Sequence, residues 1–133
     1  MSSSQRLTLN SIGHCVVALV FVAMAMLQIN DPDPHLWLTA YLVIGMIPAA
    51  TAFSFRLPVV FGVAAGMVIA GLLVSLPGFF DFLESGDYAS VGGEMSAEKP
   101  YIEPAREFLG IFIGALCLVC YRHRHRPSDP QNG

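Results

Sequence analysis

Four long runs of the sequence contain no Asp, Glu, Lys or Arg, and this pattern allows only a few kinds of fold. The runs cover residues 13–27, 36–55, 57–80 and 108–121. A helix that crosses a bilayer needs about 20 mostly apolar residues. Because the runs reach this length with their polar flanks, we expect membrane-spanning helices at about 11–29, 35–55, 57–79 and 104–121.

The composition agrees with a lipid environment. Charged residues make up 13% of the chain and hydrophobic residues 54%, whereas about 25% of an ordinary soluble domain is charged. In lipid, every backbone polar group needs an internal partner, and the runs lack the alternating polarity of a membrane β-barrel. The sequence therefore predicts an all-α polytopic membrane protein, a four-transmembrane-helix bundle that forms one membrane domain over residues 1–133.

The positive charges predict the orientation of this bundle. Arg6, Arg56 and the three arginines that follow the last helix fall on one side of the membrane, and only Lys99 and Arg106 fall on the other. Cytoplasmic segments are enriched in Lys and Arg, so we expect both termini in the cytoplasm, with a basic tail at 122–133. We expect the protein in the plasma membrane or the bacterial inner membrane, and an acidic extracytoplasmic loop at about 80–103.

The first outer joint carries the sequence QINDPDPHLW at residues 28–37, which reads as a turn between two helices. Asn30 and Asp31 are expected to end the first helix, and Pro34 suits the first position of the second. Asp33 is then the N-cap, with its carboxylate accepting from backbone N–H groups. Trp37 and the residue four positions later, Tyr41, share one helix face.

The second block opens the last helix, where Pro104 is expected at the first position. Glu103, Arg106 and Glu107 then share a face. Arg106 and Glu107 lie about one turn inside the helix, where charges are costly unless they are paired. We therefore expect Asp31 or Asp33 to pair with Arg106, which would clamp the two outer blocks together.

Together, the two blocks resemble the transmembrane protein 220 family. The shared pattern is an N-terminal Asn, then Gln-x-Asn-Asp-Pro-Asp, then Trp and Tyr four apart, then Glu-x-x-Arg-Glu-x-x-Gly. It falls on Asn10, Gln28, Asn30, Asp31, Pro32, Asp33, Trp37, Tyr41, Glu103, Arg106, Glu107 and Gly110. The resemblance implies a small multi-pass membrane protein and implies no activity.

Three functions fit these observations. The first is a non-enzymatic accessory or scaffolding component, with an acidic outer face and with the bilayer, a larger membrane complex or a homo-oligomer as its partner. The alternative is a metal-dependent binding or enzymatic site on the outer face, because oxygen and nitrogen ligands suit Ca, Mn, Zn or Fe. A transporter or channel ranks last. No cofactor or nucleic-acid partner is predicted, and we lean to a non-enzymatic role. The candidate metal ligands are Asp31, Asp33, His35, Glu103 and Glu107.

Three further features have a structural and a functional interpretation. His14 lies inside the first apolar run, where we favour a histidine bonded to backbone over a haem ligand. The run YRHRHR at 121–126 suggests attraction to anionic headgroups, in preference to metal binding through His123 and His125. The small-residue pairs are expected to pack within the bundle. These pairs are Gly62 with Gly66 and Gly110 with Gly114.

Overall fold

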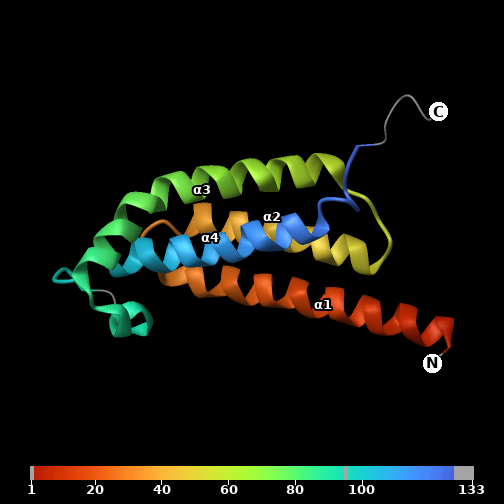
Figure 1. Ribbon diagram of the computed structural model, residues 1–133, viewed down its shortest axis with the longest axis horizontal. Helices are drawn as coiled ribbons and strands as arrows, with labels where there is room; N and C mark the ends of the chain where they lie inside the picture. The colour runs from red at the N-terminus through yellow and green to blue at the C-terminus, as the bar shows by residue number, and fades with distance from the viewer. Residues whose placement is uncertain (1, 95, 128–133) are drawn as a thin grey trace.

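In the computed structural model, which describes residues 2–94 and 96–127, four long helices lie side by side (Figure 1). Each is long and apolar enough to cross a membrane, and the described residues contain no strand. The predicted all-α bundle of four spanning helices is confirmed, while residues 128–133 of the predicted tail lie outside the described part. The elements are α1 (Ser3–Leu27), η1 (Gln28–Asn30), α2 (Pro34–Ala52), α3 (Pro58–Ser85), η2 (Tyr88–Gly92) and α4 (Ile102–Tyr121).

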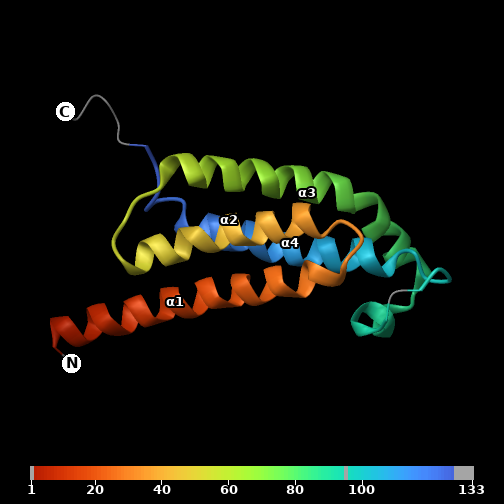
Figure 2. The same ribbon diagram turned by 180° about the vertical axis from the view of Figure 1, so that it is seen from behind.

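The second helix, α2, contributes more buried residues to the core than any other helix. Together with α4 it lies between α1 and α3, as the two opposite views show (Figures 1 and 2). Ile44 and Ile47 of α2 are fully buried, whereas Phe21 and Ala25 are the only buried residues of α1. The large apolar side chains left exposed on α1 and α3 are suited to contact with lipid, which offers every outward face an apolar environment.

Two helices are longer than predicted. The start of α1 is Ser3, not residue 11, because Ser2 and Gln5 form a capping box: the Gln5 N–H donates to Ser2 Oγ at 3.3 Å, and the Ser2 N–H donates to Gln5 Oε1 at 3.0 Å. The third helix, α3, continues past Pro77 to Ser85 and so ends later than the predicted residue 79. Both extensions lie beyond the apolar runs, so a search for apolar residues does not find them.

The connection between α3 and α4 is shorter than the predicted acidic loop at 80–103, because α3 continues to Ser85 and α4 begins at Ile102. Gly86 ends α3 with φ +68°, a left-handed conformation that favours glycine. The Lys99 ammonium donates to Asp87 Oδ2 at 2.6 Å and to Ser90 Oγ at 2.7 Å, and the Tyr101 hydroxyl donates to Asp87 at 3.2 Å. Bonding to Lys99 lowers the pKa of Asp87. The ammonium group of Lys99 is therefore bonded to residues of its own loop.

The starts of α2 and α4 also differ in detail from the predictions. Pro34 is the first residue of α2, as predicted. Asp33 occupies the N-cap position, but its side chain accepts no hydrogen bond, because its backbone, at φ −116° and ψ 57°, lies outside the β region that a capping residue normally adopts. Because α4 begins at Ile102, Pro104 lies within the first turn rather than at its first position.

His125 anchors the C-terminal tail to the α2–α3 connection, and only 1% of it is exposed. The Leu57 N–H donates to His125 Nδ1 at 3.0 Å, so Nε2 carries the proton and donates to Thr51 Oγ1 at 2.9 Å. The Thr51 hydroxyl then donates to the Ile47 carbonyl at 2.9 Å. Phe61 stacks on the imidazole, with ring centroids 6.2 Å apart. This network requires neutral His125.

Arg56 completes the anchor. Its Nε donates to the Arg124 carbonyl at 3.1 Å, and its Nη2 donates to the Arg126 carbonyl. Within the 121–126 run, His125 is therefore buried, whereas Arg122, His123 and Arg124 are exposed. The predicted attraction of this run to anionic headgroups stays a prediction.

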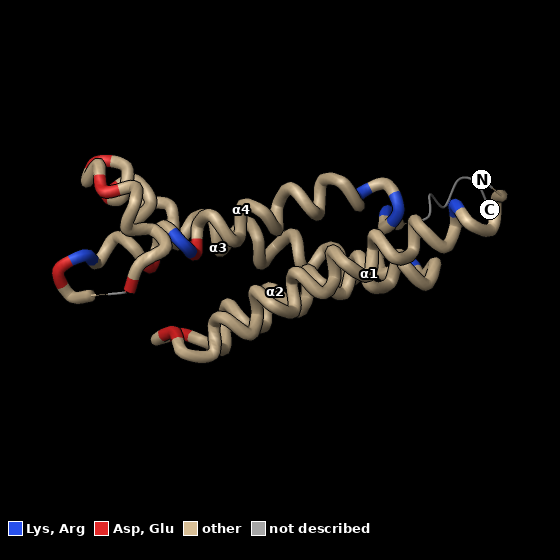
Figure 3. The backbone as a smooth tube through the Cα atoms, turned by 90° about the horizontal axis from the view of Figure 1, so that it is seen from below, with Lys and Arg blue, Asp and Glu red and all other residues tan. Residues whose placement is uncertain are grey.

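The charges separate along the bundle. Figure 3 shows Lys and Arg near both termini, and Asp and Glu concentrated at the opposite end. We call these the arginine end, with Arg6, Arg56, Arg122, Arg124 and Arg126, and the acidic end, with the α1–α2 joint, the last turns of α3, the α3–α4 connection and the start of α4. Which end faces the cytoplasm stays a prediction.

Replacing His125 tests the tail anchor. His125→Ala leaves the Leu57 N–H without its partner, and an unpaired buried donor costs about 1–3 kcal/mol. We expect the free energy of unfolding to fall by about that amount in thermal or denaturant unfolding of the protein in mild detergent. His123→Ala is the matched control, because His123 is exposed and should change stability by no more than about 0.5 kcal/mol.

The same variant gives a pH test. Burial, Arg56 and Arg124 hold the pKa of His125 below its ordinary value of 6.5. The neutral form favours the docked tail, so the stabilisation is complete above pH 6.5 and decreases as the pH falls from there toward the lowered pKa of the folded state. The stability gap between the protein and His125→Ala should therefore narrow between about pH 7.5 and about pH 5. An unchanged gap would contradict the neutral network.

Candidate functional site

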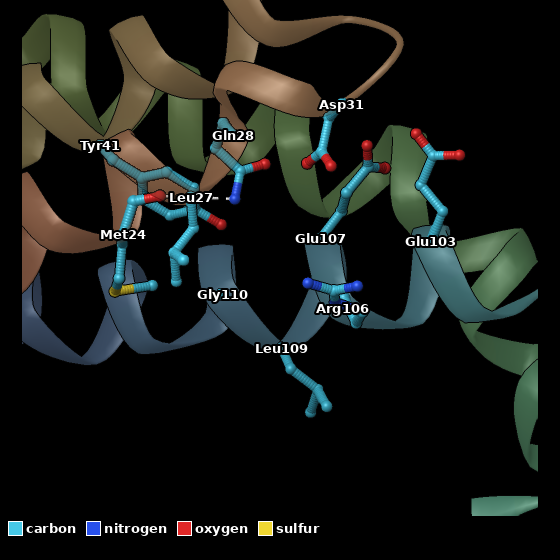
Figure 4. A pocket seen from close by; sticks show the side chains of 10 residues that line it. All are labelled: Met24, Leu27, Gln28, Asp31, Tyr41, Glu103, Arg106, Glu107, Leu109 and Gly110. Carbon is cyan, nitrogen blue, oxygen red and sulfur yellow. Dashed lines mark hydrogen bonds between the residues drawn. The ribbon is translucent and has the colours of Figure 1, made fainter. Parts of the chain in front are cut away.

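A cavity of about 240 Å³ at the acidic end brings the two sequence blocks together (Figure 4). Residues from the end of α1, from α2 and from the first turns of α4 surround it. Six of the nine predicted motif residues line this cavity, although they come from distant parts of the sequence. They are Gln28, Asp31, Tyr41, Glu103, Arg106 and Glu107. Met24, Leu27, Leu109 and Gly110 complete the lining.

Three carboxylates give the cavity its character. Asp31 follows η1, and Glu103 and Glu107 come from successive turns of α4. All three are half-buried, and Figure 4 shows their carboxylate groups gathered on the same side of α4. Carboxylates that are removed from water carry a desolvation cost unless a positive charge or hydrogen-bond donors compensate it. The arrangement is therefore suited to a positively charged ligand.

Arg106 does not supply this compensation. It is exposed, and the described part of the chain contains one ion pair within 4.0 Å, which joins Lys99 and Asp87. The predicted pairing of Arg106 with Asp31 or Asp33 is thus not formed. Adjacent helix residues point about 100° apart, so when Glu107 points into the cavity its neighbour Arg106 is left at the rim.

Tyr41 and Gly110 fix the distance between α2 and α4 beside the cavity. The Tyr41 side chain is 2% exposed, and its hydroxyl lies so close to Gly110 that a Cβ atom at residue 110 would overlap it. One turn later, a Cβ at Gly114 would lie 2.8 Å from Ile44 Cδ1. The expected packing of this glycine pair within the bundle is correct.

The other glycine pair behaves differently from the prediction. Cβ atoms at Gly62 and Gly66 would meet nothing within 4 Å, so this pair lies on an open face of α3 and not inside the bundle. The glycine spacing does not predict this difference, because the pair on α4 has the same spacing and does pack against another helix.

The remaining predicted residues lie outside the cavity. Asn30, Asp33 and His35 are exposed at the α1–α2 joint, and Trp37 is buried in the core. The apolar lining residues were missed because they carry no chemical signal of their own. On α1, however, Met24 and Leu27 stand four and one residues before Gln28, and a helix places all three on one face.

The five candidate metal ligands do not all lie together. Among residues 2–94 and 96–127, no group of three or more His, Cys, Asp or Glu side chains is arranged to hold a metal ion. Asp33 and His35 are exposed and do not line the cavity that contains Glu103 and Glu107. The five candidate ligands therefore do not form one coordination sphere.

Comparison with known proteins gives one match. A family model described as "Transmembrane family 220, helix" matches residues 20–123, which is most of the chain. The matched range contains both sequence blocks but not Asn10. No curated protein and no solved structure matches the chain.

Adding a single methyl group tests the contact between Tyr41 and Gly110. Gly110→Ala forces the Tyr41 hydroxyl away, and overpacking of this kind costs about 1–3 kcal/mol. We expect a lower midpoint of thermal unfolding in mild detergent. Tyr41→Phe removes the overlapping oxygen. Gly110→Ala should therefore lower the unfolding midpoint less in the Tyr41→Phe background than in the natural background.

Gly62→Ala is the matched control for this substitution, because a methyl group there meets open space. It should be neutral or slightly stabilising, since alanine is the better helix former by about 1 kcal/mol. If the two alanine variants had equal stability, α4 would not depend on its close approach to α2.

Proposed function

We propose that this small integral membrane protein, which belongs to transmembrane family 220, is a non-enzymatic accessory component of a membrane complex. Its acidic cavity holds a positively charged group of the partner. The family and the four apolar helices support the membrane location. The cavity supports the choice of partner chemistry.

The observation that carries this proposal is the excess of negative charge in the cavity. Asp31, Glu103 and Glu107 line it, and the single cation of the lining, Arg106, is exposed and pairs with none of them. When the three carboxyls are ionised, the lining carries three negative charges and one positive charge. A Lys or Arg side chain from a partner would supply hydrogen bonds to charged groups, which are worth about 1.5–3 kcal/mol each.

The location of the cavity supports a partner within the membrane. Glu107 stands in the second turn of α4, and the apolar side chains of Met24, Leu27 and Leu109 share the lining. A ligand here meets carboxylates and apolar groups together. This combination suits the charged residue near the end of a neighbouring transmembrane helix, whose long stem is apolar and whose head is charged.

Native purification in mild detergent, with mass spectrometry and elemental analysis of the same sample, tests the proposal. We expect a stoichiometric partner protein and no metal above background. Glu103→Gln combined with Glu107→Gln keeps the shape of the cavity and removes two charges. It should weaken the complex by about tenfold or more, as loss of a charged hydrogen bond predicts.

Asp33→Asn is the matched control, because it removes a negative charge at the same end but outside the cavity lining. It should retain the partner. A protein that is monodisperse and alone would contradict the accessory role. Retention of the partner by the double Gln variant would contradict the role of the cavity. Bound metal that disappears with these carboxylates would replace the proposal by the metal-dependent alternative.

The orientation of the complex follows from the arginines. We propose that the arginine end is cytoplasmic and that the cavity opens on the other side, in the plasma membrane or the bacterial inner membrane. A fluorescent protein fused to the C-terminus should then fold in the cytoplasm, and alkaline phosphatase inserted in the 86–101 loop should be active outside. The reverse pattern of the two reporters would invert the orientation.

A further inference from the structure

A second cavity lies at the arginine end, in the seam between α1 and α4. Its volume is about 370 Å³, and α1 contributes His14 and Val17. Because α1 packs mainly on α2, and α4 mainly on α3, this seam is not closed by tight helix packing. The cavity is separate from the acidic one and has the opposite charge. The rest of its lining is Cys117, Cys120, Tyr121 and Arg124.

His14 has an unused polar atom at this cavity. Its Nδ1 lies 2.5 Å from the Tyr121 hydroxyl oxygen, not against a backbone group as predicted. Its Nε2 is buried and has no hydrogen-bond partner within the described residues. A buried polar atom without a partner costs about 1–3 kcal/mol, and His14 lines this cavity, so a ligand that reaches Nε2 would recover this cost.

The chemistry of the lining favours an anion. When the Tyr121 hydroxyl donates to Nδ1, the proton of neutral His14 is on Nε2, which becomes a donor. Arg124 adds a cation to the same lining. All Asp and Glu residues of the described segments belong to the acidic end, so none of them neutralises Arg124 here.

The apolar part of the lining and the depth of the site favour a lipid as the source of this anion. Tyr121 is the last residue of spanning helix α4, which is the level at which headgroups lie. Val17 continues the seam along α1 toward the membrane interior. Basic pockets between transmembrane helices commonly bind anionic headgroups.

We propose that this cavity binds the phosphate group of an anionic phospholipid. Arg124 and His14 Nε2 donate to phosphate oxygens, Tyr121 holds the imidazole through Nδ1, and an acyl chain lies along the α1–α4 seam. Tyr121 thus acts as a positioning residue. The site is independent of the acidic cavity and of its partner.

Native mass spectrometry of the full chain with added lipid tests the proposal. The detergent-purified protein is titrated with phosphatidylglycerol, with zwitterionic phosphatidylcholine and, separately, with inorganic phosphate. We expect one phosphatidylglycerol to bind in preference to phosphatidylcholine. Arg124→Gln should weaken this binding about tenfold or more, as expected for a charged hydrogen bond. Arg122→Gln is the matched control, because Arg122 is exposed in the same tail and does not line the cavity.

His14→Phe separates this cavity from others that Arg124 touches, since Arg124 also lines a cavity with Thr51 and Arg56. It removes Nε2 but keeps an aromatic ring, and it should also weaken phosphatidylglycerol binding. Its unfolding midpoint is measured in detergent without lipid. If the variant is unstable, the comparison of Arg124→Gln with Arg122→Gln, two exposed positions, still decides the outcome.

Three results would overturn the proposal. Equal loss of binding in Arg124→Gln and Arg122→Gln would mean attraction to the basic surface as a whole. Equal binding of the two lipids would remove the role of negative charge. Binding of inorganic phosphate with the same dependence on Arg124 and His14, without binding of phosphatidylglycerol, would make a free phosphate the ligand.

Discussion

The close approach of α4 to α2 at Gly110 and Gly114 determines where the chemically useful groups of this protein lie. With Tyr41 over the first glycine and Ile44 over the second, α4 has one rotation that fits. This rotation turns Glu103 and Glu107 toward the α1–α2 joint, and at the other end of the same helix it brings Tyr121 to His14. Two polar sites at opposite ends thus depend on one apolar contact.

This dependence explains which parts of the structure follow from the sequence. Charge-free runs identify the four helices because lipid excludes unpaired backbone groups, and the pattern around residues 28–34 locates the first joint. The sequence also indicates that the two acidic blocks share an end. It does not reveal which of two neighbours, Arg106 or Glu107, points inward. That choice depends on the rotation of α4 about its axis. The contacts of Gly110 with Tyr41 and of Gly114 with Ile44 determine this rotation, and both partners lie on the distant helix α2.

The errors have two kinds of cause. Asp33 stands at the predicted cap position, but capping requires backbone angles that the sequence does not display. The glycine spacing is equal on α3 and α4, yet only the α4 pair has a neighbour. His125 lies among four arginine and histidine neighbours that suggest a surface. Its burial follows from the Leu57 N–H and the Thr51 hydroxyl, which lie 68 and 74 residues earlier. The first error concerns local backbone angles, and the other two concern packing between segments that are distant in the sequence.

The central position of α2 has a consequence for how the chain enters the membrane. Its buried face includes Thr51, the Tyr41 hydroxyl and Pro48, groups that a lipid-facing helix would avoid. These groups help to make α2 the least apolar of the four spanning helices, whereas its sequence neighbours α1 and α3 expose long apolar faces. Because α2 packs mainly on α1, we expect the first hairpin to insert into the membrane more favourably than α2 alone.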